Sequence, residues 1–298
     1  MRRSAIFPAA LLAGLTIMMQ PGSARASAYS DMVVFGDSLS DVGNNYQAPP
    51  YVDGRYSNGP VWVEYLNNQL GLPTLRASSA GGLDYATGGA QTSNMVTQEQ
   101  SFIAGSGAGG VDPKALYVVF GGANDLFNAP VAATVAAAIS NMAQIITDLA
   151  SAGAKDFLVP DLPDLGLTPA ASADPVDATA LTLAFNNGLL AALNAIESSV
   201  PVSITTVDTF GLLDQIAADP GGSGFTDVTD SCVTPSDASK APTCKGYLFF
   251  DDEHPTTAAH ALLAGAAADA LPVPEPATIA LLGMGLAGLG ALRRRKAD

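Results

Sequence analysis

Two short segments, far apart in the chain, carry residue types that can perform covalent chemistry together. Ser38 lies in VVFGDSLSD (33–41), just past a hydrophobic run that ends in glycine. His254 lies in DDEHP (251–255), three residues after Asp251. A serine hydroxyl is a weak nucleophile unless a base accepts its proton, and a carboxylate usually orients that base. The Asp-x-x-His spacing lets the carboxylate fold back onto its own histidine ring, so we predict that Ser38, His254 and Asp251 act together.

The chain has only one other histidine, so the choice of base is narrow. His260 lies six residues beyond His254, in a segment expected to be helical, and has no carboxylate at a comparable spacing. We interpret His260 as a structural residue or one that supports the site from behind. Asp37 and Asp41, next to the serine segment, are interpreted as turn residues that hydrogen-bond the backbone.

Acyl transfer also needs hydrogen-bond donors where negative charge develops on the substrate oxygen. YATGGAQ (85–91) and VVFGGANDLF (118–127) could supply them. Paired glycines let a backbone N–H approach a ligand without an intervening Cβ, and Asn124 offers a side-chain amide. Each segment alone is equally typical of an ordinary turn. Together with Ser38 and His254, they predict an acyl-transfer site.

Short hydrophobic runs alternate with longer helical patterns along the chain. We predict strands at 32–35, 115–120, 156–160 and 202–208, and helices at 60–71, 130–153, 180–197 and from about 256 to 271. Continuous apolar strands between helices favour a parallel sheet covered on both faces, and hence one doubly wound α/β domain. Ligands bind such sheets at the carboxyl ends of the strands. Ser38 follows the end of the first strand.

Four segments, in order, resemble the four blocks of the GDSL, or SGNH, hydrolase family: FGDSLSDVGN (35–44), YATGGA (85–90), GGAND (121–125) and DDEHP (251–255). DGRYSNGPVWVEYL (53–66) and HPTTAAH (254–260) are similar to its FFGDSL-type esterase and lipase branch, which includes phospholipases, lysophospholipases and acyltransferases. The resemblance covers residues 31–271. It implies a single flavodoxin-like, three-layer α/β/α domain with a central parallel sheet.

The resemblance also implies a role for each site residue. Ser38 would be the nucleophile, His254 the base and then the acid, and Asp251 the residue that orients the histidine. The oxyanion donors would be the backbone N–H groups of Ser38 and Gly89 and the side chain of Asn124. The implied activity is that of an exported carboxylic-ester hydrolase, an esterase or lipase with lysophospholipases among its relatives, which forms an acyl-enzyme on Ser38.

Two positions depart from the family pattern or are ambiguous within it. Asp84 stands where the second block commonly has asparagine, and the choice of Gly89 over Gly88 rests on alignment by eye. Neither changes the reaction class. The alternatives are a polysaccharide O-acetylesterase, an acyltransferase and a non-catalytic surface or matrix protein, and the complete set of site residues argues against the last. The mechanism implies no metal or organic cofactor.

The amino end has the pattern of a secretory signal peptide. Residues 1–26 start basic, continue apolar and end with small residues at Ala24 and Ala26, as signal peptidase requires. An uncleaved membrane anchor is the alternative. With this segment removed, we assign residues 27–271 as the hydrolase domain of a protein that works in the periplasm, at the cell surface or outside the cell.

Residues 272–298 resemble the Pro-Glu-Pro sorting tails of Gram-negative bacteria, which exosortases are thought to process. The tail has VPEP, then an uncharged stretch (277–292), then an arginine cluster. Sixteen residues of helix span about 24 Å, less than the roughly 30 Å hydrocarbon core of a bilayer. We therefore predict a marginal transmembrane span, adequate for a transient membrane anchor. An ordinary tail anchor is the alternative.

Charge and cysteine content constrain partners and compartment. Residues 27–271 carry 6 basic and 26 acidic side chains, a formal net charge of 6 − 26 = −20, which argues against nucleic acid as a partner. Cys232 and Cys244 are the only cysteines, and an oxidising compartment favours a disulfide between them. Two unpaired, buried thiols are the alternative. A metal site is not expected there, because no histidine lies nearby before His254.

Overall fold

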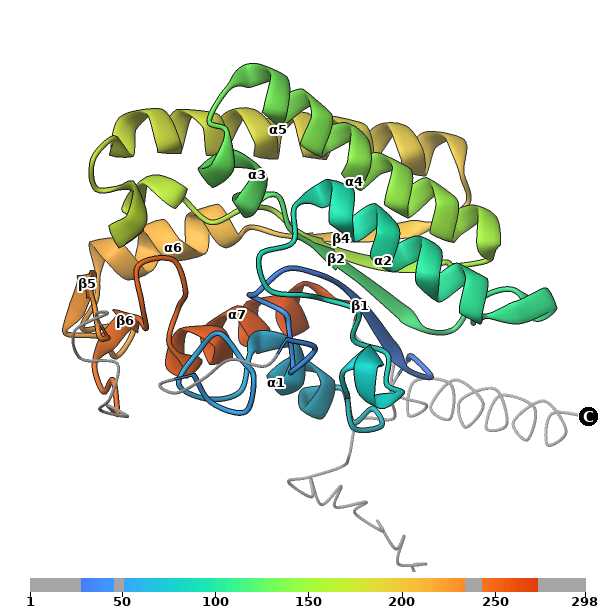
Figure 1. Ribbon diagram of the computed structural model, residues 1–298, viewed down its shortest axis with the longest axis horizontal. Helices are drawn as coiled ribbons and strands as arrows, with labels where there is room; N and C mark the ends of the chain where they lie inside the picture. Colours follow the sequence, from blue (N-terminus) through green and yellow to red (C-terminus); the bar gives the residue numbers. More distant parts are fainter. Residues whose placement is uncertain (1–27, 46–50, 234–242, 273–298) are drawn as a thin grey trace, which may run out of the picture.

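The computed structural model describes residues 28–45, 51–233 and 243–272. The predicted signal peptide, and the sorting tail beyond Pro272, lie outside the described residues. A parallel four-stranded sheet forms the centre of the described domain, in the spatial order β1-β2-β3-β4 (Figure 1). Its strands are β1 (Met32–Gly36), β2 (Leu116–Phe120), β3 (Asp156–Pro160) and β4 (Ser203–Val207).

A further extended segment, residues 83–87, runs along the outer edge of β1. Val34 donates its N–H to the Leu83 carbonyl at 3.0 Å and accepts the N–H of Tyr85 at 2.8 Å. Counting this segment as a strand gives the flavodoxin-like order 2-1-3-4-5, in which the winding direction changes between β1 and β2. The prediction of a flavodoxin-like sheet is therefore confirmed. Such sheets bind ligands at this switch point, which is where Ser38 lies.

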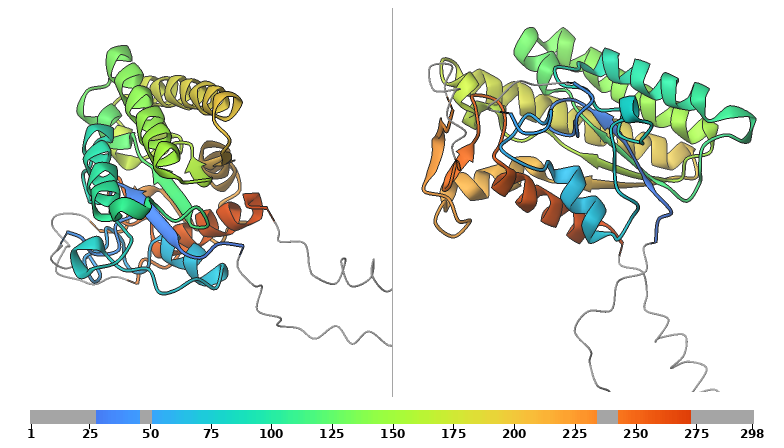
Figure 2. Two further views of the ribbon diagram at one scale, coloured as in Figure 1. Left: turned by 90° about the vertical axis from the view of Figure 1, so that its right-hand side faces the viewer. Right: turned by 60° about the horizontal axis from the view of Figure 1, so that its bottom comes forward.

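Helices cover both faces of the sheet, as continuous apolar strands require (Figures 1 and 2). One layer consists of α2 (Thr92–Gly105), α4 (Ala132–Ala152) and α5 (Pro175–Ser199), and the other of α1 (Trp62–Gln69) and α7 (Thr257–Ala270). Two shorter helices, α3 (Ala123–Asn128) and α6 (Thr209–Ala218), follow β2 and β4 directly. They therefore lie at the carboxyl ends of the strands, beside the predicted site.

The sequence predictions did not include α2, α3, α6 or the two strands that follow α6, and they began α5 at residue 180, whereas it begins at Pro175. On α2 the buried positions are Thr92, Met95, Glu99 and Phe102, so the inward face has helical spacing but half of it is polar. A pattern search based on hydrophobic residues does not detect such a helix.

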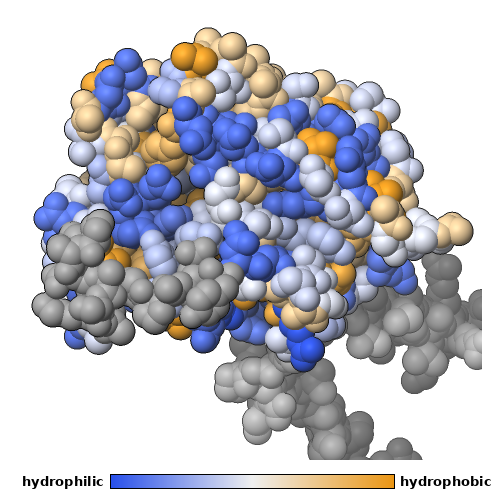
Figure 3. Space-filling model, in the orientation of Figure 1, coloured by the Kyte–Doolittle hydropathy of each residue, from blue (hydrophilic) through white to orange (hydrophobic). Residues whose placement is uncertain are grey.

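Within the described residues, α5 is the one helix long and apolar enough to cross a membrane. It packs on α4 in the outer layer and turns Phe185, Leu189 and Leu193 inward. The core of the domain therefore accounts for this inward stripe, whereas Leu183 and Leu190 on the same helix are exposed. Hydrophilic residues make up much of the face seen in Figure 3, with smaller apolar areas among them.

A small second sheet carries the segment that precedes His254. It pairs β5 (Asp227–Ser231) with β6 (Tyr247–Phe249), and Cys232 and Cys244 form a disulfide beside it. The N–H of Cys232 donates to Phe249 O at 3.1 Å, and Cys244 is buried in a cluster with Phe250. The disulfide therefore braces the two residues that come just before Asp251.

Removal of this disulfide is expected to destabilise the domain. The cysteines are 12 positions apart, and opening a loop of that size costs about 3 kcal/mol in the chain-entropy model. The Cys232→Ser/Cys244→Ser variant should therefore unfold at a lower urea concentration than the oxidised parent. Equilibrium unfolding followed by circular dichroism measures the difference. Equal midpoints for the oxidised parent, the reduced parent and the variant would contradict a bracing role.

Candidate active site

Ser38 is held at the tip of β1 by a tight turn. The N–H groups of Ser40 and Asp41 both donate to the Asp37 carbonyl at 3.1 Å, and the Leu39 N–H donates to Asp37 Oδ1 at 3.0 Å. These bonds reverse the chain directly after the strand. The side chain of Ser38 is thereby directed into a cavity at the carboxyl edge of the sheet.

Ser40, the other serine of this turn, makes a structural hydrogen bond instead. Ser40 is fully buried, and its Oγ accepts the indole N–H of Trp62 at 3.0 Å. Ser38 is therefore the serine of this segment whose hydroxyl faces a base.

The structure brings Ser38, His254 and Asp251 into one chain of hydrogen bonds. Ser38 Oγ lies 2.7 Å from His254 Nε2, across 216 positions of sequence. His254 Nδ1 lies 2.9 and 2.8 Å from the two carboxylate oxygens of Asp251. An ionised carboxylate only accepts hydrogen bonds, so Nδ1 carries the proton and Nε2 is free to accept one from Ser38.

Asp251 is fixed by its own turn and by a neighbouring tyrosine. Its Oδ1 accepts the backbone N–H groups of Glu253 at 2.9 Å and His254 at 2.7 Å. Its Oδ2 accepts the hydroxyl of Tyr51 at 3.0 Å. Burial opposes ionisation of Asp251, but its hydrogen bonds and the charge of His254 outweigh burial and lower its pKa. Asp251 is therefore an anion at neutral pH.

The same environment makes His254 a stronger base than a free imidazole. Burial of the ring disfavours its charged form, whereas the carboxylates of Asp251, Glu253 and Asp37 favour it, and the net effect raises the pKa of His254. Burial also raises the pKa of Asp37 to about 6. His254 can therefore take the proton from Ser38, and the nearby carboxylates stabilise the imidazolium that forms.

Two tyrosines at this site were not singled out by sequence reasoning. Tyr51 bonds Asp251, and the ring of Tyr56 lies 5.1 Å from the ring of His254. The sequence did offer a signal for Tyr56, because this residue belongs to the segment 53–66 that resembles the esterase and lipase branch.

Asn124 lines the same cavity as Ser38, at the start of α3. Its Nδ2 donates one hydrogen to Ala90 O at 3.2 Å, which fixes the amide group. The amide has a second hydrogen, so it can serve a ligand without losing this contact.

The paired glycines have different roles. The Gly88 N–H donates to Asp41 Oδ2 at 2.9 Å, and a Cβ at Gly88 would overlap the ring of Tyr56. The Gly89 N–H has no acceptor within the described part of the chain. Gly89 also has a φ of +76°, which favours glycine. Of the two, Gly89 is therefore the residue with an N–H available to a ligand.

The departure at Asp84 has a structural explanation. Asp84 is fully buried, and its two carboxylate oxygens accept the N–H groups of Val42 at 2.8 Å and Ala86 at 3.0 Å. An asparagine has one side-chain oxygen and could not match both donors in the same way. Asp84 thus ties the serine-bearing loop to the paired-glycine segment.

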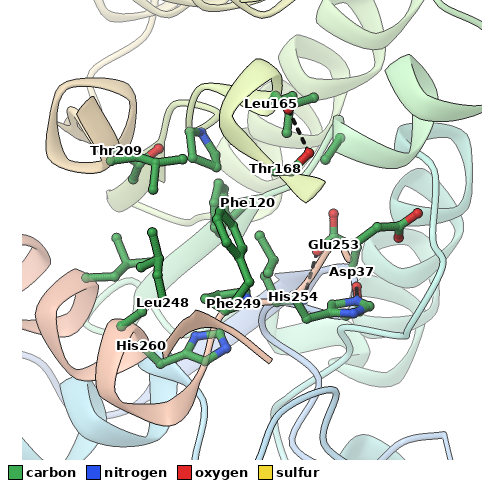
Figure 4. Close-up of a pocket in the computed structure, with 18 of the residues that line it drawn as sticks. Asp37, Phe120, Leu165, Thr168, Thr209, Leu248, Phe249, Glu253, His254 and His260 are labelled. Atoms are coloured by element: carbon green, nitrogen blue, oxygen red, sulfur yellow. Dashed lines mark hydrogen bonds between the residues drawn. The ribbon is translucent and has the colours of Figure 1, made fainter. Parts of the chain in front are cut away.

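The cavity beside Ser38 is mainly apolar (Figure 4). Its apolar lining includes Phe120, Phe127, Leu165, Leu213, Leu248 and Phe249. These residues come from β2, α3, α6, β6 and the loop after β3, so the cavity is formed where these elements meet. Within the described ranges, no group of three or more His, Cys, Asp or Glu side chains is arranged to hold a metal ion.

Comparison with known families gives two matches. Residues 32–267 match the family described as GDSL-like Lipase/Acylhydrolase. Residues 272–296 match the PEP-CTERM protein-sorting motif, which indicates export and sorting in Gram-negative bacteria.

Several characterised proteins are similar in sequence. The chain is 29% identical to a phosphatidylcholine-sterol acyltransferase of Aeromonas hydrophila, over 86% of this chain and 94% of that protein. It is 26% identical to the thermolabile hemolysin of Vibrio parahaemolyticus (84% and 65% covered). It is 30% identical to the esterase EstA of Pseudomonas aeruginosa (91% and 51% covered). The chain thus spans nearly all of the first protein and about half of the last.

Solved structures share the fold at low sequence identity. A putative GDSL-like lipase from Parabacteroides merdae superposes with a TM-score of 0.52 at 12% identity, covering 83% of this chain and 98% of that one. An acetylxylan esterase from Geobacillus stearothermophilus also gives 0.52 at 11% identity, covering 85% and 99%. The match of the family to most of the chain identifies the protein: it belongs to the GDSL-like lipase/acylhydrolase family of carboxylic-ester hydrolases.

Proposed function

We propose that the protein hydrolyses carboxylic esters through an acyl-enzyme on Ser38. Ser38 Oγ attacks the ester carbonyl while His254 Nε2 accepts its proton, and Asp251 holds the opposite ring nitrogen. His254 then gives the proton to the departing alcohol, and water attacks the acylated serine by the same route. The observation that supports this most directly is the 2.7 Å contact between Ser38 Oγ and His254 Nε2.

The backbone N–H groups of Ser38 and Gly89 and the side chain of Asn124 are the proposed oxyanion donors. Neither backbone N–H has an acceptor among the described residues. Asn124 Nδ2 keeps one hydrogen free beside the cavity. Donors that are already fixed need no reorganisation when charge develops on the substrate, which is why such groups lower the barrier.

The apolar lining of the cavity supports a preference for esters whose acyl group is longer than acetyl. The acyl group remains attached to Ser38 after the alcohol has left, so it is the portion of the substrate that the apolar cavity can hold throughout the reaction. An acetyl group would fill little of a cavity that Phe120, Leu213 and Leu248 help to line. This lining favours an esterase or lipase over the alternative of a polysaccharide O-acetylesterase.

Acyl transfer is a second candidate activity. The similarity to the Aeromonas hydrophila acyltransferase, over 86% of this chain, supports it. The first half of the reaction would be identical, and an alcohol instead of water would then take the acyl group from Ser38.

The proposed working form is an exported domain of residues 27–271. Signal peptidase would remove residues 1–26, and an exosortase would act on the tail at 272–298 after it engages the membrane. The PEP-CTERM match supports export and sorting. The periplasm, the cell surface and the medium all remain compatible with this route.

Substitution of the proposed nucleophile gives the first test. Ser38→Ala should lower kcat/KM on p-nitrophenyl butyrate by about 10³-fold or more, because the acyl-enzyme cannot form. Ser79→Ala is the matched control, since Ser79 is exposed and its side chain makes no bond within the described chain. A Ser38→Ala enzyme as active as the Ser79→Ala enzyme would exclude the assignment.

Chain-length preference gives the second test. Each buried CH₂ contributes about 0.8 kcal/mol, so p-nitrophenyl hexanoate should exceed the acetate in kcat/KM by about tenfold or more. Leu263→Trp should reduce hexanoate turnover and spare acetate, because Leu263 lines the cavity. Leu262→Trp is the matched control on the exposed side of α7. A parent enzyme that prefers acetate would favour the O-acetylesterase instead.

The pH profile gives the third test. His254 must be neutral to act as a base, so activity is present above its pKa and is lost as pH falls through it. Because the pKa of His254 is raised, the acid limb of kcat/KM should lie above the ordinary histidine value of about 6.5. Asp251→Asn should move that limb to lower pH and reduce kcat. Activity that stays level down to pH 5 would contradict His254 as the base.

A further inference from the structure

His260, which the proposed reaction does not use, faces the same cavity as Ser38. It lies near the start of α7 and is 1% exposed. Figure 4 shows its ring beside Leu248 and Phe249, on the side of the cavity that also holds His254. Neither Nδ1 nor Nε2 of His260 has a hydrogen-bond partner in the described part of the protein.

Two threonines and an asparagine of the cavity already have at least one side-chain hydrogen bond each. The Thr168 hydroxyl donates to Leu165 O at 2.7 Å, and the Thr209 hydroxyl donates to Asp161. Asn124 is held by a backbone carbonyl. His260 differs from them in that neither ring nitrogen has a partner among the described residues. A buried polar group without a partner destabilises the folded state. A ligand that supplied the missing partner would recover that free energy on binding.

His260 is not suited to act as a second base. Burial, with a smaller contribution from His254, lowers the pKa of His260 to about 3. The ring therefore stays neutral, with one nitrogen that donates and one that accepts. A hydroxyl group has the matching property, since it also both donates and accepts. Apolar side chains such as Leu248 and Leu263 line the cavity with it, so an aliphatic chain that carries one hydroxyl fits this lining.

We propose that His260 recognises a hydroxyl group on the acyl chain, so that hydroxyacyl esters are preferred substrates. The inference rests on the proposed acyl-enzyme function, because it assumes that the acyl chain enters the cavity beside Ser38. It replaces the sequence interpretation of His260 as structural with a role in specificity.

The test compares methyl hexanoate with methyl 2-, 3- and 6-hydroxyhexanoate. Acid release is followed by titration, and each kcat/KM is divided by the rate of hydroxide hydrolysis of the same ester. At least one hydroxy ester should exceed hexanoate by about tenfold or more, since a polar group that is otherwise unpaired discriminates strongly. The preference should be the same from pH 6 to 9, because His260 does not titrate in that range.

Substitution of His260 should remove this preference selectively. His260→Leu should bring the ratio of hydroxy ester to hexanoate close to one and increase the thermal unfolding midpoint. His260→Gln, which keeps a donor and an acceptor, should retain part of the preference. Thr168→Val is the matched control: it removes a hydroxyl from the same cavity that is already bonded, so the ratio should not change.

Three results would overturn the proposal. One is that no hydroxy ester is preferred by the parent, as expected if His260 binds only a water molecule. Another is that the preference survives in His260→Leu, and the third is that Thr168→Val abolishes it equally. Loss of the proposed function is distinguishable, because it would appear as unchanged hexanoate hydrolysis by Ser38→Ala.

Discussion

The contact between Ser38 and His254 is the constraint on which the other features of the site depend. It joins positions 216 residues apart at 2.7 Å. Its two sides come from separate parts of the fold: the end of β1 and the loop between β6 and α7. The central sheet fixes one side. The other is fixed by the turn at Asp251 and by the small sheet with its disulfide, which packs against Phe250.

Buried carboxylates position much of the backbone around this contact. Asp41 and Asp84 accept N–H groups on both sides of the gap between the serine loop and the paired-glycine segment. Burial raises the pKa of Asp41 and raises that of Asp84 well above its usual range, and the backbone N–H groups that these side chains accept offset part of this cost. The interpretation of Asp41 as a turn residue was thus incomplete. Through its bond to Gly88 it also shapes the segment that presents the N–H of Gly89.

The features that could be predicted from the sequence are those encoded by residues close together in the chain. The four strands of the central sheet follow from apolar runs, and the family, with the flavodoxin-like fold that it implies, follows from ordered motifs. Pairing of Asp251 with His254 follows from a three-residue spacing. The cavity could not be predicted, because it forms only where β2, α3, α6 and α7 meet. For the same reason, the lack of a hydrogen-bond partner for His260 among the described residues could not be predicted. Helix α2 could not be predicted because Glu99 occupies a buried position.

One measurement tests the hydrogen-bonded chain directly. The protein has two histidines, so ¹⁵N-histidine labelling gives an NMR spectrum with one set of ring signals for each. His254 should be protonated on Nδ1 at high pH, and its ring should titrate above the ordinary value of about 6.5. Asp251→Asn should abolish the deshielded signal of the Nδ1 proton. Rapid tautomer exchange at His254, with an ordinary pKa unaffected by Asp251→Asn, would contradict the account.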